Sequence, residues 1–508
     1  MSILTKPSKW MPTISPRGLA KLTALLGPPM MIGFLVYNHY SLIAVLAGLL
    51  AIGVVALIAD KPEATTAIVL FIVYANIPVV LKKTYGLPDL VAGSFFLLLF
   101  VPLLHYLVIR QQPVVTNEIL SVMVAYLAAL LISATFSGQA QQSVDRVLSY
   151  VLEGLILYIL ILNTIRTPAL LHQAIWALIL AGVLMGSISL YQEAKGDYEN
   201  SFGGMSVVND SVINTGQVTT FGKEIKRPRL AGPLGEKNRY AQVMVVLLPL
   251  ALFRIWSERR MVLRVAAAAS CIPIIGGALL TFSRGAGIAI VITLLAMAVL
   301  RTIKLWQLLV LCIVGYAFIS LAVPDYLYRL STTSDVAVLA SGNASEAGGS
   351  VRGRATENLA AVHIFLDHPF LGVGPGQTSR YTTEYGNAVG FRRLAGERRA
   401  HNMYLEELSD TGIIGFTLFM SIIGMTLYQL IELRRKWLKR QPEVAYTAAS
   451  FIVAIIAYLL TAIFLHLSYV RYYWLLLALA AAAIRVLNTT EATQASPAFA
   501  HTRKAVTP

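Results

Sequence analysis

The sequence has few charged residues and almost no cysteine. Charged side chains make up 13% of the 508 residues and hydrophobic ones 56%, whereas a soluble protein carries about 25% charged residues. The composition therefore excludes an ordinary soluble domain and indicates a polytopic membrane protein. The two cysteines, Cys271 and Cys312, both lie within apolar runs, so we expect neither a disulfide framework nor a zinc site.

Long apolar runs account for most of the chain. A membrane-spanning helix needs about 20 such residues, and this length predicts an all-α bundle of about 12–14 spans. Prolines interrupt two of the runs, Pro28 and Pro29 in the first and Pro78 in the third. The candidate spans lie near residues 19–36, 42–59, 66–81, 91–109, 119–136, 147–162, 170–191, 240–256, 262–281, 288–300, 305–323, 413–431, 446–465 and 472–486.

The net charge of +15 comes from basic residues that are scattered in short loops. That pattern fits lipid headgroups and membrane topology better than nucleic acid. Three loops are rich in basic residues and are therefore predicted to be cytoplasmic, namely 432–443, 258–264 and 301–304. If successive spans cross the membrane in alternating directions, both termini are cytoplasmic as well. The basic pair Lys82-Lys83 does not fit this topology, because it would lie on the outer side of the membrane. Because the start of the chain is basic and polar, we expect no cleavable signal peptide.

This topology divides the chain into six parts and places two long polar segments outside. In the second external segment, residues 352–366 have the spacing of an amphipathic helix, which should end at His368-Pro369. Residues 196–226 are polar and could be an acceptor-recognition loop or disordered. The parts are N-terminal helices (1–191), an external loop (192–239), helices that enclose a short hairpin (240–323), a large, partly helical external loop (324–411), C-terminal helices (412–486) and a cytoplasmic tail (487–508).

Three basic clusters should lie on the external face, at residues 227–239, 281–285 and 398–405. Arg284, at the end of a predicted span, could be an isolated headgroup anchor. Its small neighbours Ser283 and Gly285 would let another group approach closely, and the planar guanidinium suits phosphate oxygens. Three such clusters on one face therefore indicate a site for a phosphate-bearing, lipid-linked substrate.

His401 follows Arg398 and Arg399 directly. It could be a buried histidine that satisfies a backbone carbonyl. Neighbouring positive charges should instead lower its proton affinity and keep the imidazole neutral, as a general base requires. Glu406 and Glu407 are expected in a solvated first helical turn. No metal site is expected, because Pro369 interrupts the only nearby set, His363, Asp367 and His368.

Four segments carry a family resemblance. Residues 229–241 contain Arg-x-x-Gly…Asn-x-x-Ala, residues 283–285 Ser-Arg-Gly, residues 368–376 Pro-x-x-Gly-x-Gly-x-Gly and residues 401–415 His-Asn-x-x-Leu. Their order and spacing resemble the O-antigen ligase and O-antigen polymerase superfamily of bacterial membrane glycosyltransferases, with Arg354 at the position of a frequent upstream arginine. The N-terminal half is similar only in hydropathy.

The resemblance implies a fold related to the lipid-phosphate-dependent (GT-C-like) glycosyltransferases of the bacterial inner membrane, with the active site facing the periplasm. The donor would be a glycan on undecaprenyl pyrophosphate, and the acceptor lipid A-core in lipopolysaccharide biosynthesis, with no metal or other cofactor. His401 would be catalytic. The donor pyrophosphate would be bound by Arg229, Arg239, Arg284 and Arg354, with support from Asn238, Ser283 and Asn402.

Other functions remain open at this point. The same motifs would serve an O-antigen or exopolysaccharide polymerase, or a protein O-oligosaccharyltransferase. A small-anion transporter is a different class. Such a transporter should carry charges near the middle of its spans, whereas the charges here cluster towards one face.

Overall fold

The computed structural model describes residues 61–88, 92–93, 95–218, 224–300, 303–323, 325–331, 349–466 and 471–494. Within these ranges eight helices are long and apolar enough to cross a membrane, or nine if a bent pair forms one span. The predicted all-α, polytopic membrane fold is thus confirmed. The candidate spans 19–36 and 42–59 lie outside the described residues.

The helices that meet this test agree with predicted spans. Four of them begin at capping side chains, Asn117, Thr167, Glu236 and Asn402. Asn117, for example, accepts a hydrogen bond from the Leu120 amide. They are α7 (Glu118–Thr135), α8 (Ala140–Tyr150) continued by η3 (Val151–Ile156) and α9 (Leu157–Thr164), α10 (Pro168–Lys195), α11 (Lys237–Ser257), α12 (Met261–Leu279), α19 (Met403–Trp437), α20 (Pro442–Ala462) and α21 (Arg471–Gln494).

The predicted span 66–81 is a bent pair of helices, with the break close to the interruption predicted at Pro78. Two helices, α3 (Pro62–Tyr74) and α4 (Ile77–Tyr85), meet there at 53°. Asn76 between them adopts a left-handed conformation with φ 59°, and Pro78 lies in the first turn of α4, where its missing amide costs no helical hydrogen bond. Shorter apolar helices complete the set, namely η1 (Phe95–Leu99), α6 (Phe100–Leu104), η2 (His105–Ile109), α13 (Arg284–Val299) and α14 (Leu305–Ala322).

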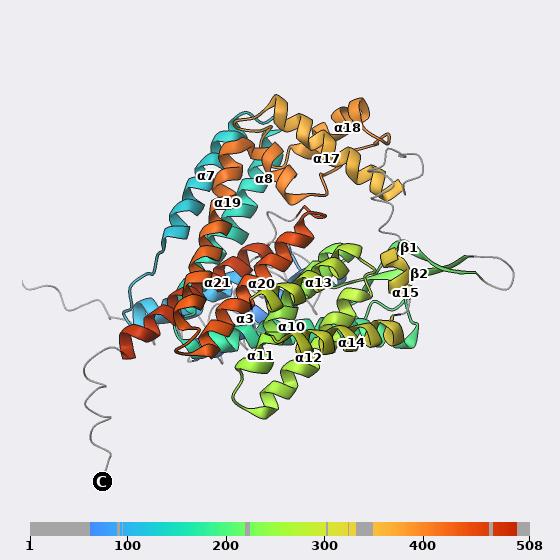
Figure 1. Ribbon diagram of the computed structural model, residues 1–508. Coiled ribbons are helices and arrows are strands. Elements are labelled where there is room, and N and C mark those ends of the chain that lie inside the picture. Colours follow the sequence, from blue (N-terminus) through green and yellow to red (C-terminus); the bar gives the residue numbers. More distant parts are fainter. Residues whose placement is uncertain are drawn as a thin grey trace, which may run out of the picture.

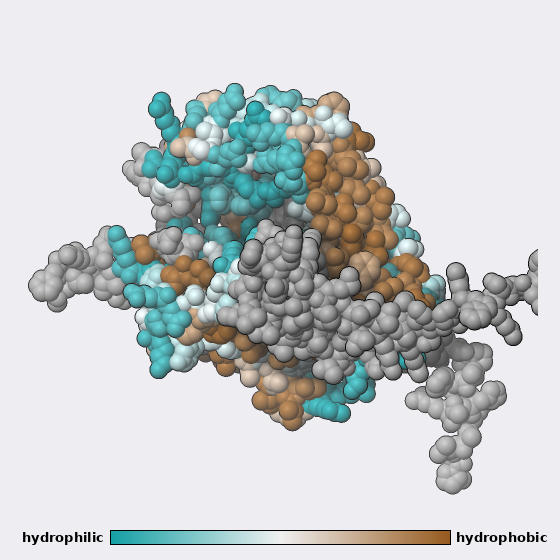
Figure 2. All heavy atoms as spheres, turned by 180° about the vertical axis from the view of Figure 1, so that it is seen from behind, coloured by the Kyte–Doolittle hydropathy of each residue, from teal (hydrophilic) through white to brown (hydrophobic). Residues whose placement is uncertain are grey.

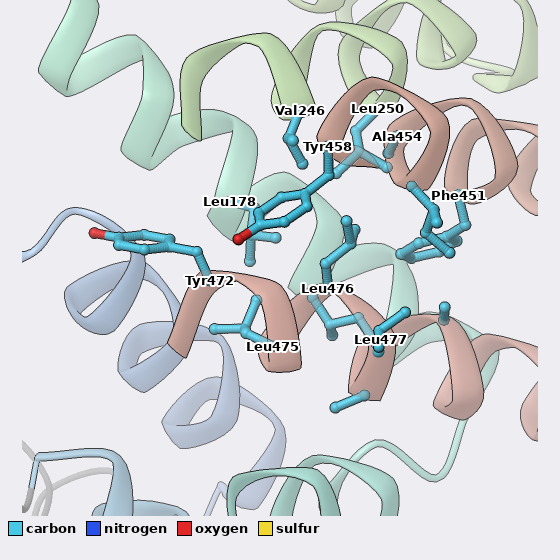
Figure 3. Packing of buried hydrophobic residues seen from close by; sticks show 14 of the residues in the cluster. Leu178, Val246, Leu250, Phe451, Ala454, Tyr458, Tyr472, Leu475, Leu476 and Leu477 are labelled. Carbon is cyan, nitrogen blue, oxygen red and sulfur yellow. The ribbon is translucent and has the colours of Figure 1, made fainter. Parts of the chain in front are cut away.

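The core of the bundle is centred on α11, which packs against α10, α12 and α20. Almost every side chain of α11 is buried, so this helix lies inside the bundle rather than at its lipid-facing rim. Figure 3 shows how leucines of α21 and Tyr458 of α20 pack together with Leu178 and Val246 from the neighbouring helices.

A polar layer covers one end of the bundle. It contains α17 (Gly349–Asp367) and α18 (Thr378–Val389), which lie beside the upper ends of α7, α8 and α19 (Figure 1). We call residues 349–402 the cap. Hydrophilic side chains gather over this end of the molecule and an apolar surface lies below them on one flank (Figure 2). The helix α17 covers the helix predicted at 352–366 and ends just before His368-Pro369.

Part of the unassigned segment forms a β-hairpin. Strands β1 (Val207–Val218) and β2 (Glu224–Gly232) pair antiparallel, with Val207 opposite Gly232 and irregularities further along. Arg227 in β2 forms ion pairs with Glu193 in α10 and Asp325 in α15 (Asp325–Ser331). These two pairs hold the base of the hairpin against the same end of the bundle as the cap.

Candidate active site

The end of β2 is joined to the short hairpin between α12 and α13. The Arg229 Nε donates a hydrogen bond to the Thr281 carbonyl at 2.6 Å, and its NH2 group donates to Asn238 Oδ1 at 3.3 Å. The Leu230 amide also donates to the Leu280 carbonyl at 3.1 Å. Arg229 and Asn238 are therefore brought directly against the hairpin that carries Arg284.

That hairpin is a tight, fixed turn. The Ser283 amide donates to Thr281 Oγ1 at 3.2 Å, and the Ser283 carbonyl accepts from the Tyr326 hydroxyl at 2.6 Å. Arg284 is then the first residue of α13 and is half-buried. A Cβ on Gly285 would lie 3.1 Å from the Phe464 ring, so the small residue beside Arg284 admits the segment that follows α20.

In the cap, α17 presents Arg354 and Glu357 one helical turn apart. Burial lowers the pKa of the Arg354 guanidinium, and the positive charge of Arg284 lowers it further, whereas Glu357 and Glu236 act in the opposite direction. Arg284 and Arg354 therefore lie close enough to repel each other. Two arginines held together in this way favour an anion between them.

His401 is bound to a buried carboxylate. Its Nδ1 lies 2.7 Å from Glu357 Oε2, and the side chain of Glu357 is 2% exposed, against 35% for His401. In a neutral imidazole, a hydrogen bond donated from Nδ1 to this carboxylate leaves Nε2 as the nitrogen that can accept a proton. The ring is thus oriented by a buried partner and remains accessible to a substrate.

The arginines that precede His401 have carboxylate partners, which the prediction from sequence did not include. In the structure Arg398 contacts Glu357 at 3.3 Å, and Arg399 contacts Glu406 at 2.7 Å. Both positive charges are therefore opposed by carboxylates. The sequence did not predict Glu357 as the partner of His401, because the two residues are 44 positions apart. The only indication was that Glu357 follows the predicted site residue Arg354 by one helical turn.

A second histidine, His466, lies edge-on to His401, with ring centroids 5.5 Å apart. Burial lowers the pKa of His466 to about 2, and the charges of Arg399, His401, Arg239 and Arg146 add to this effect. His466 is therefore neutral. The predicted Arg239 is thus near His466, and so is Arg146 of α8, which no motif had indicated.

The glycine-rich turn at residues 372–376 is hydrogen-bonded to α19. Asp410 accepts hydrogen bonds from the Gly376 amide at 2.7 Å and from the Thr378 amide at 2.9 Å. The turn encloses a break in α19 at Gly412, where φ is 63°. A Cβ on Gly412 would lie 2.3 Å from the Phe370 backbone, and one on Gly372 would lie 2.4 Å from that of Asp410. Only glycine permits this approach.

The expectation of a solvated first turn at Glu406 and Glu407 is wrong, because their exposed fractions are 2% and 0%. Glu406 pairs with Arg399, and Glu407 accepts a hydrogen bond from the Tyr126 hydroxyl in α7. Asn402 caps α19, with its side chain accepting from the amides of Tyr404 and Leu405 at 3.0 and 3.2 Å. This cap fixes the start of the helix directly after His401.

The described residues contain no group of three or more His, Cys, Asp or Glu side chains that could hold a metal ion. The acidic groups nearest His401 are instead used in pairs with arginine and histidine. The chemistry available here is that of hydrogen bonds, fixed positive charge and an imidazole.

The fold and this site together define a multi-pass membrane protein with a cationic, histidine-containing site at one end of its helical bundle. Residues 269–420 match the family model described as O-antigen ligase. The predicted resemblance to the O-antigen ligase family is therefore confirmed for these residues, which are less than a third of the chain. A search of curated proteins finds no match.

The matched residues contain only part of the site. Ser283, Arg284, Arg354, Glu357, His401 and Asn402 lie within 269–420. Arg229, Asn238 and Arg239 precede this stretch, and Arg146 and His466 lie further away on either side of it. The fold brings segments from outside the family domain to the same end of the bundle.

Proposed function

We propose that this protein transfers a glycan from undecaprenyl pyrophosphate to an acceptor hydroxyl, at the periplasmic face of the bacterial inner membrane and without a metal. The O-antigen ligase domain and the multi-pass fold support the reaction class. The observation that carries the proposal is the accessible imidazole of His401, oriented by buried Glu357 beside Arg354 and Arg284. A base next to fixed cations suits transfer from a phosphate leaving group.

In the proposed reaction, the acceptor oxygen attacks the anomeric carbon of the donor sugar. His401 Nε2 takes the hydroxyl proton as the new carbon–oxygen bond forms, and Glu357 stabilises the imidazolium that results. The bond between the anomeric carbon and the pyrophosphate oxygen breaks, and its electron pair leaves with undecaprenyl pyrophosphate. No oxidant or cofactor is needed to balance this step.

The arginines would stabilise the charge that develops on the leaving group. Arg284 and Arg354, from α13 and the cap, would hold the pyrophosphate from two sides, with Arg239 contributing from the start of α11. Arg229 is only 7% exposed and is hydrogen-bonded to the Thr281 carbonyl and Asn238. We therefore assign Arg229 a second task, to hold the Ser283-Arg284 hairpin in place.

We propose lipid A-core as the acceptor, in agreement with the ligase description of the matched family. The chemotype of a deletion strain tests this choice. Loss of polymer from lipid A-core with accumulation of lipid-linked polymer supports a ligase. A single repeat unit still attached to the core means a polymerase, and unchanged lipopolysaccharide with loss of protein-bound glycan means a protein O-oligosaccharyltransferase.

The catalytic assignment is tested by transfer in proteoliposomes with a purified lipid-linked donor and a lipid A-core acceptor. His401→Ala should abolish transfer while the protein is still inserted. His368→Ala is the matched control, because His368 is an exposed histidine of the same cap and makes no side-chain hydrogen bond among the described residues. Transfer by His401→Ala at the level of His368→Ala would contradict the proposal.

A further inference from the structure

The segment that follows α20 contacts two separate parts of the candidate active site. Phe464 packs beside the Ser283-Arg284-Gly285 hairpin, since a Cβ on Gly285 would lie 3.1 Å from the Phe464 ring. Two residues later, the His466 ring lies edge-on to His401, with centroids 5.5 Å apart and ring planes at 88°. The segment therefore reaches from the hairpin of Arg284 to the proposed base, and His466 lies at the end nearest the base.

The two ring nitrogens of His466 differ in their surroundings. Nδ1 is enclosed and has no hydrogen-bond partner. Nε2 also makes no hydrogen bond with the residues that the structure describes, but it is not enclosed in this way. In proteins a buried N–H without an acceptor is rarer than a buried acceptor without a donor. We therefore place the single proton of the neutral imidazole on Nε2, the nitrogen that a ligand can reach.

Packing alone does not account for a histidine at this position. A phenylalanine ring would make the same edge-on contact with His401 and would bury no polar atom. The enclosed Nδ1 is a buried polar group without a partner, which is costly and calls for an explanation. The cost is explained if the same ring has to present its Nε2–H to a ligand.

The charges around His466 favour an anionic ligand. Burial is the main cause that lowers the pKa of His466, and the positive charges of Arg399, His401, Arg239 and Arg146 lower it further. These cations come from the cap, α11 and α8 and surround a ring that stays neutral. A neutral N–H among arginines can donate to a phosphate oxygen without adding another positive charge to repel them.

We propose that His466 is a further substrate-binding residue, whose Nε2 donates a hydrogen bond to the pyrophosphate of the lipid-linked donor beside His401. The inference rests on the proposed function for the identity of the anion. It goes beyond that function because His466 lies outside the matched residues 269–420 and belongs to none of the predicted motifs. Since Nε2 of His466 already carries a proton, it would not compete with His401 for the proton of the acceptor.

The experiment measures binding to the full-length protein in a mild detergent by native mass spectrometry. The probes are undecaprenyl pyrophosphate, undecaprenol and inorganic pyrophosphate. His466→Phe keeps a ring but loses the donor, and it should weaken binding of undecaprenyl pyrophosphate about tenfold, as expected for one hydrogen bond to a charged group. Binding of undecaprenol, which has no phosphate, should be unchanged. His466→Gln keeps an N–H donor and should recover most of the loss.

The matched control is His105→Phe. His105 is half-buried like His466 and lies in η2 next to Tyr106, whose ring contacts Arg166 close to the start of α10. This substitution removes an imidazole away from the candidate active site, so binding of undecaprenyl pyrophosphate should not change.

Four results would overturn the proposal. These are wild-type binding by His466→Phe, no recovery in His466→Gln, an equal loss of undecaprenol binding, and inorganic pyrophosphate that binds as tightly as undecaprenyl pyrophosphate. The last result would mean a site for a free anion rather than for a lipid-linked donor. Glycan transfer by His401→Ala is measured in parallel. Retained transfer would overturn the proposed function, whereas the binding assay needs no turnover and decides the role of His466 separately.

Discussion

Two histidine–glutamate pairs lie at opposite ends of the helical bundle. At the cap end His401 Nδ1 lies 2.7 Å from Glu357, and at the far end His172 Nε2 lies 2.6 Å from Glu258. Both carboxylates are buried, and the histidine side chains are exposed to almost the same extent, 35% and 38%. The pairing itself therefore says little about catalysis.

The surroundings of the two pairs differ. Glu258 is shared: although burial opposes ionisation, hydrogen bonds from Trp176 and His172 hold its pKa below the usual value. Glu258 thereby ties α10 to the end of α11. At the cap end Glu357 orients His401 through Nδ1, and the groups around it come from many separate segments, namely Arg146, Arg239, Arg284, Arg354 and His466. Arginines also line a cavity beside the far pair, but all three come from the single stretch 254–260. The comparison therefore indicates that cations brought together from separate segments, rather than the pair, distinguish a candidate active site.

Substitution of the two histidines should give the largest difference between the two ends of the bundle. His401→Ala should lower the initial rate of glycan transfer by about 10²–10⁴-fold, the range typical of a general base. His172→Ala should change the rate far less, because no donor-binding group is proposed beside it. Initial rates in proteoliposomes, normalised to inserted protein, measure both. Equal losses would place both pairs in a structural role.

A large effect is also expected at Arg284. Arg284→Lys should lose nearly as much transfer as Arg284→Ala, since lysine keeps the charge but not the planar fork that grips two phosphate oxygens. The same assay, run over a range of donor concentrations, measures the loss. Arg435→Lys, in the basic last turn of α19, is the matched control. An active Arg284→Lys enzyme would mean that Arg284 only anchors the helix end.

Glu357→Gln should have an intermediate effect. A glutamine keeps the shape but cannot stabilise the imidazolium as a carboxylate does, so we expect a loss of transfer smaller than that of His401→Ala. Glu357→Asp should recover part of the rate. The corresponding Glu258→Gln should instead lower the thermal midpoint of unfolding, because it weakens contacts between α10 and α11. A Glu357→Gln variant with full kcat would mean that the hydrogen bond between Glu357 and His401 has no role in the reaction.

The smallest effect is expected at Gly376. Its φ is 77°, and an added Cβ would lie 2.6 Å from Arg146 Cγ. Arg146 lies near His466 and adds positive charge to the proposed donor site. Gly376→Ala should therefore displace Arg146 and raise the donor KM more than it lowers kcat. Gly396→Ala is the control, since Gly396 also has a positive φ, 69°, but has no atom within 4 Å of an added Cβ. Identical effects of the two variants would mean that Gly376→Ala acts through backbone strain alone and not through Arg146.

The positive-inside pattern predicts that the two ends of the bundle face different compartments. In a Cys312→Ser background, which removes the exposed native thiol, a cysteine at Ala388 should react with an impermeant reagent in intact cells. A cysteine at Gln441 should react only after permeabilisation. The reverse labelling pattern would put the cap in the cytoplasm and exclude a periplasmic reaction.

Much of this architecture could be predicted from hydropathy and motif order. The spans α7 to α12 and α19 to α21 follow from apolar length alone, and the end of α17 follows from His368-Pro369. The sequence predicted that Arg284 and His401 would be functional, because their residue types are unusual at the ends of apolar helices. The interruption near Pro78 was predicted, but the left-handed conformation of Asn76 was not, since such a residue leaves little signal in a hydropathy pattern.

What could not be predicted depends on tertiary contacts. The burial of Glu407 depends on Tyr126 from α7, and Glu357 becomes the partner of His401 only once the cap folds back on α19. Arg146 and His466 lie outside every recognisable motif. The β-hairpin in the polar insert is held by ion pairs of Arg227 with two distant helices, which local propensity cannot indicate.

The central claim is that one site at the cap end holds both the pyrophosphate and the base. A structure of the full-length protein with a non-hydrolysable polyprenyl-pyrophosphate glycan would test it most directly. We predict phosphate oxygens within hydrogen-bonding distance of Arg284 and Arg354, and a path for the acceptor hydroxyl to His401 Nε2 at about 3–3.5 Å. A donor bound away from Arg284, or with its anomeric carbon out of reach of an acceptor held by His401, would contradict the account.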